Sequence, residues 1–376
     1  MEIYERHLQF SSQLENKIWD DLLNRQRYLA LKVIADDAAK LRLLAKLLDQ
    51  MDLIHTVEGL KVDLLLPQVN LALFKEKLTE IFNDPSLDQQ MNNLNQKYRV
   101  LWQAGRFEFN LTERPVIYGI LNVTPDSFYD GGWYQSETAI LKRVSEMVGA
   151  GVDVIEVGGQ TTRPGFVEIP LEEELKRVTQ VLDLIQKNFS QVAVAIDTYK
   201  YAVMERVIDY VDIINDVNAF TDDQRKLALM RNSNVGLLTM HSARNKDYDN
   251  LTAEMKTFFE ENIATLVQNG ININRIALDQ GIGYAKKADG YQDYAMMKNI
   301  DQFNYLNRPM MIAISRKGFG AKLFGLPKED RLPVTLVAEA YMYLHGGRIL
   351  RVHDIAETVQ LAKMLDVIQN GYWFGS

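Results

Sequence analysis

The chain has 376 residues, which is too long for one minimal domain and short for three. Its hydrophobic fraction of 47% and charged fraction of 24% are ordinary for a globular protein with a large core. It contains no cysteine, which excludes disulfides, thiol nucleophiles and cysteine-ligated metals. Its formal net charge of −8 argues against nucleic acid as a partner, although a local basic pocket for a small anion remains compatible with it.

No targeting or membrane segment is visible. The stretch from Met1 to Arg6 has neither the basic n-region nor the apolar h-region of a signal peptide. The longest apolar stretches, such as Pro309 to Ile314, are strand-sized and far below the ~20 residues that cross a bilayer. We therefore expect a cytoplasmic protein with no membrane partner.

Residues 1–95 are rich in Leu, Lys, Asp and Gln and contain almost no glycine. Apolar residues recur at helical spacing over Tyr28 to Met51 and over Leu71 to Phe82. The stretch between them, Leu53 to Leu66, predicts one or two short strands with Gly59 at a turn. We predict a small helical or α+β accessory domain that serves packing or oligomerisation, because it holds no chemical motif.

From about Tyr98 the pattern changes. Val100 to Leu111 alternates apolar and polar residues around Gly105, as a β-hairpin does. Strand-like apolar runs then alternate with helical patterns eight times. The predicted strands are Val116–Leu121, Val154–Val157, Val192–Ile196, Ile213–Asn215, Gly236–Met240, Arg275–Leu278, Met310–Ile314 and Ile349–Val352. The predicted helices are Glu137–Ala150, Leu171–Asn188, Tyr201–Tyr210, Asp222–Arg231, Asp249–Asn269, Tyr291–Leu306, Pro333–Leu344 and Ala356–Gln369.

Eight strand–helix units of about 30 residues each predict a parallel sheet with helical crossovers. Eight is also the number of strands that closes a barrel. We therefore expect an α/β fold, a (β/α)8 TIM barrel over residues 96–376. An open doubly wound sheet is the alternative.

Polar residues follow every predicted strand, whereas the strand interiors are apolar. In a closed barrel all eight carboxyl ends lie on one face, and that face carries the active site. Helix capping explains a single such residue, for instance Asp216 or Asp354, but not all eight polar ends. The concentration predicts an enzyme whose site is built from Asn122, Glu156, Asp197, Asn215, Met240, His241, Asp279, Ser315, Lys317, Arg351 and His353.

The residue types narrow the substrate. Asp197, Asn215 and Asp279 supply acceptors and an amide, which suit a flat heterocycle with an amino-pyrimidinone edge. A second set supplies positive charge and an anion-binding donor, which suit a pyrophosphate or a carboxylate: Arg163, Lys317, Arg351 and His353. No Walker A motif, strand-linked G-x-G-x-x-G or Ser-His-Asp order is present, and no histidine pair has metal-ligand spacing.

Six segments resemble the signatures of the dihydropteroate synthase family, in that family's order. They are Gly119–Phe128, Gly159–Gly165, Ile196–Lys200, Ile214–Val217, Ser315–Lys317 and Arg351–Asp354. The resemblance runs from about Leu101 to the C-terminus and includes the hairpin, with which the family plugs the barrel bottom. It implies that the amine of p-aminobenzoate displaces pyrophosphate from 6-hydroxymethyl-7,8-dihydropterin pyrophosphate, giving 7,8-dihydropteroate in folate biosynthesis.

The resemblance also implies roles for individual residues. The implied pterin site consists of Asp197, Asn215, Met240, Asp279 and Lys317. Asn122 would bind the Mg²⁺ that accompanies pyrophosphate, and Arg351 and His353 would bind the anion itself. The implied catalytic residues are Asp197, Lys317, Arg351 and His353, while Thr162, Arg163 and Ser315 would belong to the mobile loops and the p-aminobenzoate site. The family further implies a homodimer and a target of sulfonamides.

Five positions depart from the family pattern. Glu156 stands where Asp is usual, Gln160 and Thr161 replace Glu and Ser, Gln280 replaces proline, and Gly318 replaces Ser. The implied pterin and anion ligands are all retained, so we expect activity. The departures in the loops bear on p-aminobenzoate affinity and sulfonamide sensitivity.

Two alternatives differ in class. A pterin-binding methyltransferase barrel would keep the pterin carboxylates but would not need the implied pyrophosphate set, which is Asn122, Arg163, Arg351 and His353. A non-catalytic pterin-binding relative would be expected to have lost some polar strand ends, and none of the important ones is lost.

Overall fold

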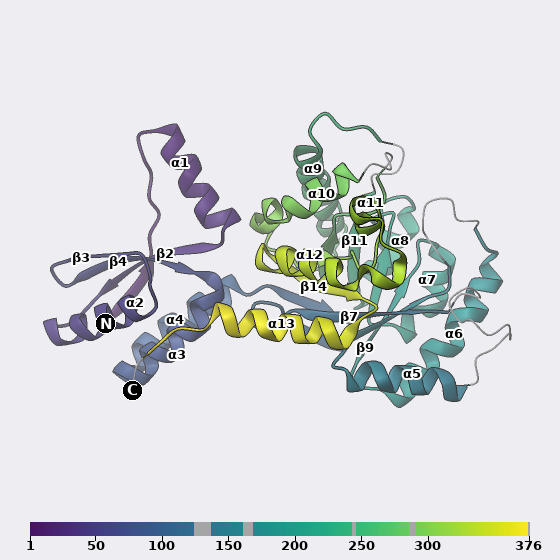
Figure 1. Ribbon diagram of the computed structural model, residues 1–376, viewed down its shortest axis with the longest axis horizontal. Coiled ribbons are helices and arrows are strands. Elements are labelled where there is room, and N and C mark those ends of the chain that lie inside the picture. The colour runs from purple at the N-terminus through teal and green to yellow at the C-terminus, as the bar shows by residue number, and fades with distance from the viewer. Residues whose placement is uncertain (124–136, 161–167, 243–245, 286–289, 375–376) are drawn as a thin grey trace. The chain divides into compact units, whose positions relative to one another are not determined.

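The computed structural model describes residues 1–123, 137–160, 168–242, 246–285 and 290–374. The chain divides into two compact units (Figure 1), which are Met1–Val100 with Lys363–Ser376, and Leu101–Ala362. The predicted division into 1–95 and 96–376 did not include the return of the C-terminal segment to the first unit. Within the described residues, no helix combines the length and the apolar character that a membrane span requires.

The first unit is built on a four-stranded antiparallel sheet with the strand order β1-β2-β4-β3. Its strands are β1 Glu2–Glu5, β2 Tyr28–Ile34, β3 His55–Glu58 and β4 Lys61–Pro67. Its helices are α1 Gln13–Asp20, α2 Ala38–Gln50, α3 Leu71–Phe82 and α4 Pro85–Tyr98, with a π-helical turn at Asp21–Arg25. The unit is therefore α+β, one of the two accessory folds that we expected.

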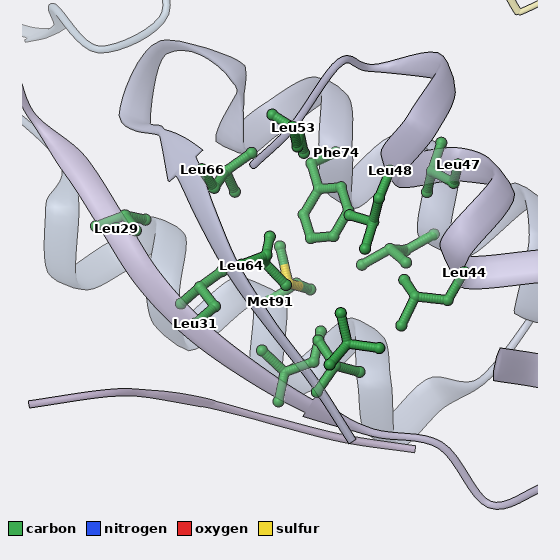
Figure 2. Close-up of a cluster of buried hydrophobic side chains, with 14 of the residues drawn as sticks. Leu29, Leu31, Leu44, Leu47, Leu48, Leu53, Leu64, Leu66, Phe74 and Met91 are labelled. Atoms are coloured by element: carbon green, nitrogen blue, oxygen red, sulfur yellow. The ribbon is translucent and has the colours of Figure 1, made fainter. Parts of the chain in front are cut away.

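The core of this unit lies between the sheet and helices α2, α3 and α4. Figure 2 shows Leu31 of β2 and Leu64 of β4 with Leu44 of α2 and Phe74 of α3, all of them buried. The C-terminal segment joins this core, since the Tyr372 side chain packs against it and its hydroxyl donates to Asn70 Oδ1 at 2.9 Å. Residues far apart in the sequence thus complete one core.

Part of the helical prediction for Tyr28 to Met51 was wrong. Tyr28–Ile34 forms the central strand β2, which pairs with β1 and β4, while α2 takes up only the second half. A short apolar run fits a helix and a strand equally well, and here neighbouring strands decide the outcome. The turn at Gly59 is confirmed, with a φ of +60° between β3 and β4. Strand β1 and helices α1 and α4 were not predicted.

The second unit is a closed barrel of eight parallel strands in the order β10-β11-β12-β13-β14-β7-β8-β9. The strands are β7 Val116–Asn122, β8 Val154–Gly158, β9 Ala193–Asp197, β10 Ile213–Asp216, β11 Gly236–Met240, β12 Ile276–Asp279, β13 Met310–Ile312 and β14 Gly347–Val352. The predicted (β/α)8 barrel is confirmed, and the open-sheet alternative is wrong because β7 pairs with β14.

Helices surround this barrel (Figure 1). They are α5 Glu137–Gly149, α6 Leu171–Asn188, α7 Tyr201–Val207, α8 Gln224–Arg231, α9 Leu251–Gln268, α10 Tyr291–Lys298, α11 Phe319–Phe324, α12 Leu332–Leu344 and α13 Ile355–Gln369. Each predicted barrel helix is present, and 3-10 segments at Ile208–Tyr210 and Ile300–Leu306 complete two of them. The short helix α11 was not predicted.

A β-hairpin of β5 Leu101–Ala104 and β6 Phe107–Asn110 covers the amino end of the barrel strands. The buried Trp102 indole donates from Nε1 to the Arg275 carbonyl oxygen at 3.0 Å, directly before β12. Arg106 pairs through two nitrogens with Asp212, directly before β10, at 3.0 and 2.8 Å. The hairpin therefore plugs the barrel bottom, as the family resemblance implied, and lies opposite the polar strand ends.

Candidate active site

The polar strand ends converge because parallel strands place their carboxyl ends on one face. The pairing register sets Asp197 of β9 beside Asn215 of β10, and Met240 of β11 beside Asp279 of β12. Paired residues of neighbouring strands point to the same side of the sheet. The register alone therefore groups four of the predicted pterin residues into two adjacent pairs.

Arg351 at the end of β14 links two carboxylates. Its Nε donates to Glu156 Oε1 at 2.8 Å, and its Nη2 contacts the same oxygen. Nη2 also donates to Asp197 Oδ2 at 3.1 Å. Burial acts to lower the pKa of Arg351, but Glu156 and Asp197 outweigh it and raise that pKa above its ordinary value. Arg351 is therefore a fixed cation held between β8 and β9.

Glu156 also binds Asn215. Its Oε2 accepts from Asn215 Nδ2 at 2.9 Å, and the Glu156 side chain is only 1% exposed. Two oxygens in this network, Asp197 Oδ1 and Asn215 Oδ1, are buried and accept no hydrogen bond within the described part of the chain. An unpaired buried acceptor costs roughly 1–3 kcal/mol, so both oxygens mark a place where a donor of a ligand is expected.

The pKa of Asp197 is raised to about 7. Burial is the main cause, and the negative charge of Glu156 adds to it, while Arg351 opposes both. The neutral form of a carboxyl is favoured where its charge loses solvation and faces another carboxylate. Asp197 thus titrates close to neutral pH.

Asp279 and Lys317 form the other side of the site. Asp279 Oδ1 accepts from the Gly281 backbone at 2.8 Å, and burial raises the pKa of this carboxyl although Lys317 counteracts the effect. Lys317 Nζ donates to the Ile282 carbonyl oxygen. Burial lowers the pKa of Lys317 to about 8, while Asp279 acts in the opposite direction. The two groups form an electrostatic pair whose lysine can still lose its proton in mildly alkaline solution.

Ser315 and His353 lie together after β13 and β14. Ser315 Oγ lies 3.0 Å from His353 Nδ1, and the His353 backbone N–H donates to Ser315 Oγ at 3.2 Å. These contacts hold His353 against Ser315. Of the predicted anion-binding residues, Arg351 and His353 both lie at the end of β14, and the hydrogen bonds of Arg351 within the described ranges use Nε and Nη2 but not Nη1.

Asn122 ends β7 beside Gly158, where a Cβ built on that glycine would lie 3.1 Å from Asn122 Oδ1. The described residues hold no cluster of three or more His, Cys, Asp or Glu side chains suited to a metal ion. A single amide oxygen fits Mg²⁺, which usually keeps several waters and binds through one or two protein oxygens plus substrate phosphates. Two other predicted residues, Thr162 and Arg163, lie outside the described residues, as does Thr161.

Several residues that support the site were noted only as departures or not at all. Gln160 Oε1 accepts from the Ile169 backbone at 3.1 Å and from Lys200 Nζ at 2.9 Å, so it joins both ends of the β8–α6 connection. Gln280 donates from Nε2 to the Met296 carbonyl oxygen at 2.9 Å, which anchors the turn that proline would otherwise stiffen. Lys200 follows β9 inside a matched motif, and that position was its only signal.

Helix capping does not account for Asp216 and Asp354. Asp216 accepts from the backbones of Asn218 and Phe220 and from the buried Lys226 at 2.8 Å, which orders the turn after β10. Asp354 pairs through both oxygens with Arg316 at 2.8 Å. Both carboxylates support the backbone next to site residues.

A sequence model of the pterin binding enzymes matches residues 118–353, which include every strand end of this site. Fold and site together define a pterin-binding barrel enzyme. Among curated proteins, the chain is 36% identical over 268 residues to the dihydropteroate synthase of Clostridium beijerinckii, covering 71% of this chain and 98% of the relative. It is 34% identical to the dihydropteroate synthase of Bacillus subtilis, over 69% of this chain and 90% of the relative. The chain belongs to the dihydropteroate synthase family and is a transferase.

Solved structures agree with this assignment. The Burkholderia cenocepacia dihydropteroate synthase complexed with 7,8-dihydropteroate matches with a TM-score of 0.64 and 30% identity, over 72% of this chain and 97% of that one. The Xanthomonas albilineans enzyme with 4-aminobenzoic acid matches with a TM-score of 0.67 and 29% identity, over 72% and 98%. The Yersinia pestis enzyme with a sulfonamide drug matches with a TM-score of 0.66 and 29% identity, over 72% and 99%. The methyltransferase and non-catalytic alternatives are not favoured by these relatives.

Proposed function

We propose that the chain condenses p-aminobenzoate with 6-hydroxymethyl-7,8-dihydropterin pyrophosphate to give 7,8-dihydropteroate and pyrophosphate. The observation that carries this proposal is the pair of buried, unpartnered oxygens of Asp197 and Asn215 beside the cations Arg351 and Lys317. A substrate with N–H donors at one end and a polyanion at the other satisfies both features. The similarity to the dihydropteroate synthases of Clostridium beijerinckii and Bacillus subtilis supports the same reaction.

On this proposal the pterin edge lies against the acceptor side. The ring donates from its 2-amino group and a ring N–H toward Asp197, Asn215 and Asp279. Lys317 donates to an acceptor of the ring, and Met240, which is 3% exposed, supplies an apolar wall. The carboxylates are buried, so their hydrogen bonds to the ligand are stronger than the same bonds would be in water.

The leaving group lies toward Arg351, His353 and Ser315. Arg351 offers Nη1, and a planar guanidinium suits phosphate oxygens. We propose that Mg²⁺ accompanies the pyrophosphate and that Asn122 supplies one protein oxygen to it. When bound, the ion neutralises charge on the departing pyrophosphate.

The reaction needs no protein nucleophile. The amine nitrogen of p-aminobenzoate forms a bond to the exocyclic methylene carbon, the carbon–oxygen bond to pyrophosphate breaks, and the nitrogen loses one proton. Alignment of two reactants can contribute roughly 7–11 kcal/mol in the best intramolecular cases. Asp197, Asn215 and Lys317 would supply that alignment by fixing the pterin, and Arg351 and His353 would stabilise the leaving group.

Further parts of the proposal concern the partner substrate and the assembly. We propose that Thr162, Arg163 and Ser315 contribute to the p-aminobenzoate site, and that sulfonamides compete there. We also propose a cytoplasmic homodimer. Exposed apolar residues on one side of α12, namely Val337, Tyr341 and Leu344, support a dimer surface on the barrel unit.

The test is pyrophosphate release by the purified full chain, followed together with the mass of the pteridine product. We expect release only when the pterin pyrophosphate, p-aminobenzoate and Mg²⁺ are all present, and we expect EDTA to abolish it. Absence of dihydropteroate at saturating substrates would refute the proposal. Release without p-aminobenzoate would indicate a hydrolase instead.

A further inference from the structure

Glu156 is a buried side chain at the site with partners on two other strands, although the reaction itself assigns it no role. It lies on β8, and it binds Arg351 of β14 with Oε1 and Asn215 of β10 with Oε2. The side chain is 1% exposed. One carboxylate thus links its own strand β8 to β10 and β14.

The chemistry of a carboxylate fixes the orientation of Asn215. An ionised carboxylate only accepts hydrogen bonds, so the amide must turn its NH₂ toward Glu156, at 2.9 Å. Asn215 Oδ1 then points away from Glu156 and is left buried without a partner. In the reverse orientation, two oxygens would face each other and the nitrogen would face the ligand.

The same carboxylate governs Asp197 through Arg351. Because Glu156 Oε1 holds the guanidinium through Nε and Nη2, Arg351 reaches Asp197 only at Oδ2. Asp197 Oδ1 therefore stays without a partner. Asp197 and Asn215 are register partners on adjacent strands, so their side chains point to the same side of the sheet, and each leaves one oxygen there without a partner.

We propose that Glu156 is a positioning residue that turns Asn215 and Arg351 so that two adjacent oxygens face the ligand. The ligand selected by this arrangement presents two neighbouring N–H donors, as an amino-pyrimidinone does. This inference rests on the proposed function and adds a specificity determinant to it.

The test compares Glu156→Gln with Glu156→Asp by calorimetric binding of 6-hydroxymethylpterin to the full chain. Glutamine has one oxygen, which Arg351 takes, and its NH₂ forces Asn215 to accept with Oδ1 and to present Nδ2 to the pterin. We expect the Kd to rise about tenfold or more in Glu156→Gln. Aspartate keeps two acceptors, so Glu156→Asp is expected to recover most of that loss.

A double-mutant cycle shows whether Glu156 acts through Asn215. In an Asn215→Ala background, we expect Glu156→Gln to raise the Kd by clearly less than it does in the wild type, because the amide that it reorients is gone. The matched control is Glu339→Gln on α12, a buried glutamate whose partner is Thr358 at 3.5 Å. It is expected to leave the Kd unchanged.

Unchanged pterin affinity in Glu156→Gln would overturn the inference, and so would an equal loss with and without the Asn215 amide. A loss in Glu156→Asp as large as that in Glu156→Gln would do the same. Pyrophosphate release by the wild type distinguishes a failure of the inference about Glu156 from a failure of the proposed function. An active wild type with a normal Glu156→Gln variant refutes only the inference, whereas an inactive wild type that binds no pterin refutes the proposed function as well.

Discussion

Asp197→Asn is expected to weaken pterin binding while stabilising the fold. In the wild type, Asp197 Oδ2 accepts from Arg351 and Oδ1 is buried without a partner. The asparagine oxygen would replace Oδ2, and its NH₂ would then face the N–H donors of the pterin. Losing a hydrogen bond to a charged acceptor costs roughly 1.5–3 kcal/mol, which corresponds to roughly a 10- to 150-fold higher Kd.

The effect on stability has the opposite sign. The pKa of Asp197 is raised to about 7 from its ordinary value of 3.8, so between these pH values the folded state binds more protons than the unfolded state. The free energy of unfolding of the wild type therefore falls as pH rises through this window, by roughly 1.4 kcal/mol per pKa unit at most. Asparagine does not titrate. The variant should thus be more stable than the wild type at pH 8, and the difference should vanish near pH 4.

Urea unfolding at pH 4, 6 and 8 measures the stability, and calorimetric titration with 6-hydroxymethylpterin at pH 8 measures the binding. Asp223→Asn at the N-terminus of α8 is the matched control, since its carboxylate pairs with Arg225 and its pKa is lowered to about 2. It should leave pterin affinity unchanged and should not stabilise the fold at pH 8. Retained affinity in Asp197→Asn with a native circular dichroism spectrum would place the pterin elsewhere. If Asp197→Asn were less stable than the wild type at pH 8, the charge of the buried Asp197 carboxylate would not be destabilising, and the reasoning would be refuted.

Three further predictions concern other parts of the chain. Burial lowers the pKa of Lys317 to about 8, so this side chain loses its charge as pH rises past that value. The KM for the pterin substrate should therefore increase between pH 7 and 9. A Lys317→Arg variant that shows the same increase would exclude this lysine as its cause. Trp102→Ala should lower the unfolding free energy of the barrel by roughly 3–5 kcal/mol, because the indole is fully buried. The pterin Kd of the folded protein should not change, because the indole lies at the barrel end remote from the site. If the variant unfolds at the same urea concentration as the wild type, the hairpin does not stabilise the barrel. Asn70→Ala should destabilise the first unit by roughly 1–3 kcal/mol, since it removes the partner of Tyr372 and of the Gln369 carbonyl oxygen. An unchanged thermal unfolding temperature would show that these contacts of the C-terminal segment contribute little to the stability of the first unit.

Local signals explain why most of the barrel was predictable. Buried parallel strands appear in the sequence as apolar runs, and the helices that cover them appear as amphipathic patterns. The strand at Val154–Val157 and the helix at Leu171–Asn188 could therefore be predicted from the sequence alone. The polar residue after each strand could be placed on the active face because strand direction in a barrel is uniform. Tyr28–Ile34 lacked such a signal, since its strand character depends on pairing with β1 and β4.

Partner choice within the site could not be predicted. Glu156 and Arg351 are far apart in the sequence, and only the closed barrel brings them into contact. Position in the chain cannot say that Glu156 holds the Asn215 amide, or that Gln160 receives Lys200. The attachment of Tyr372 to the first unit depends on a similarly distant contact.

A crystal structure of the chain with 6-hydroxymethylpterin would show whether the polar strand ends of the barrel hold the pterin ring. We expect the amino-pyrimidinone edge to lie at hydrogen-bond distance, about 2.7–3.2 Å, from Asp197 Oδ1 and Asn215 Oδ1, with Lys317 Nζ on another acceptor of the ring. A pterin bound away from these strand ends, or one that turns its amino-pyrimidinone edge away from Asp197 and Asn215, would contradict it.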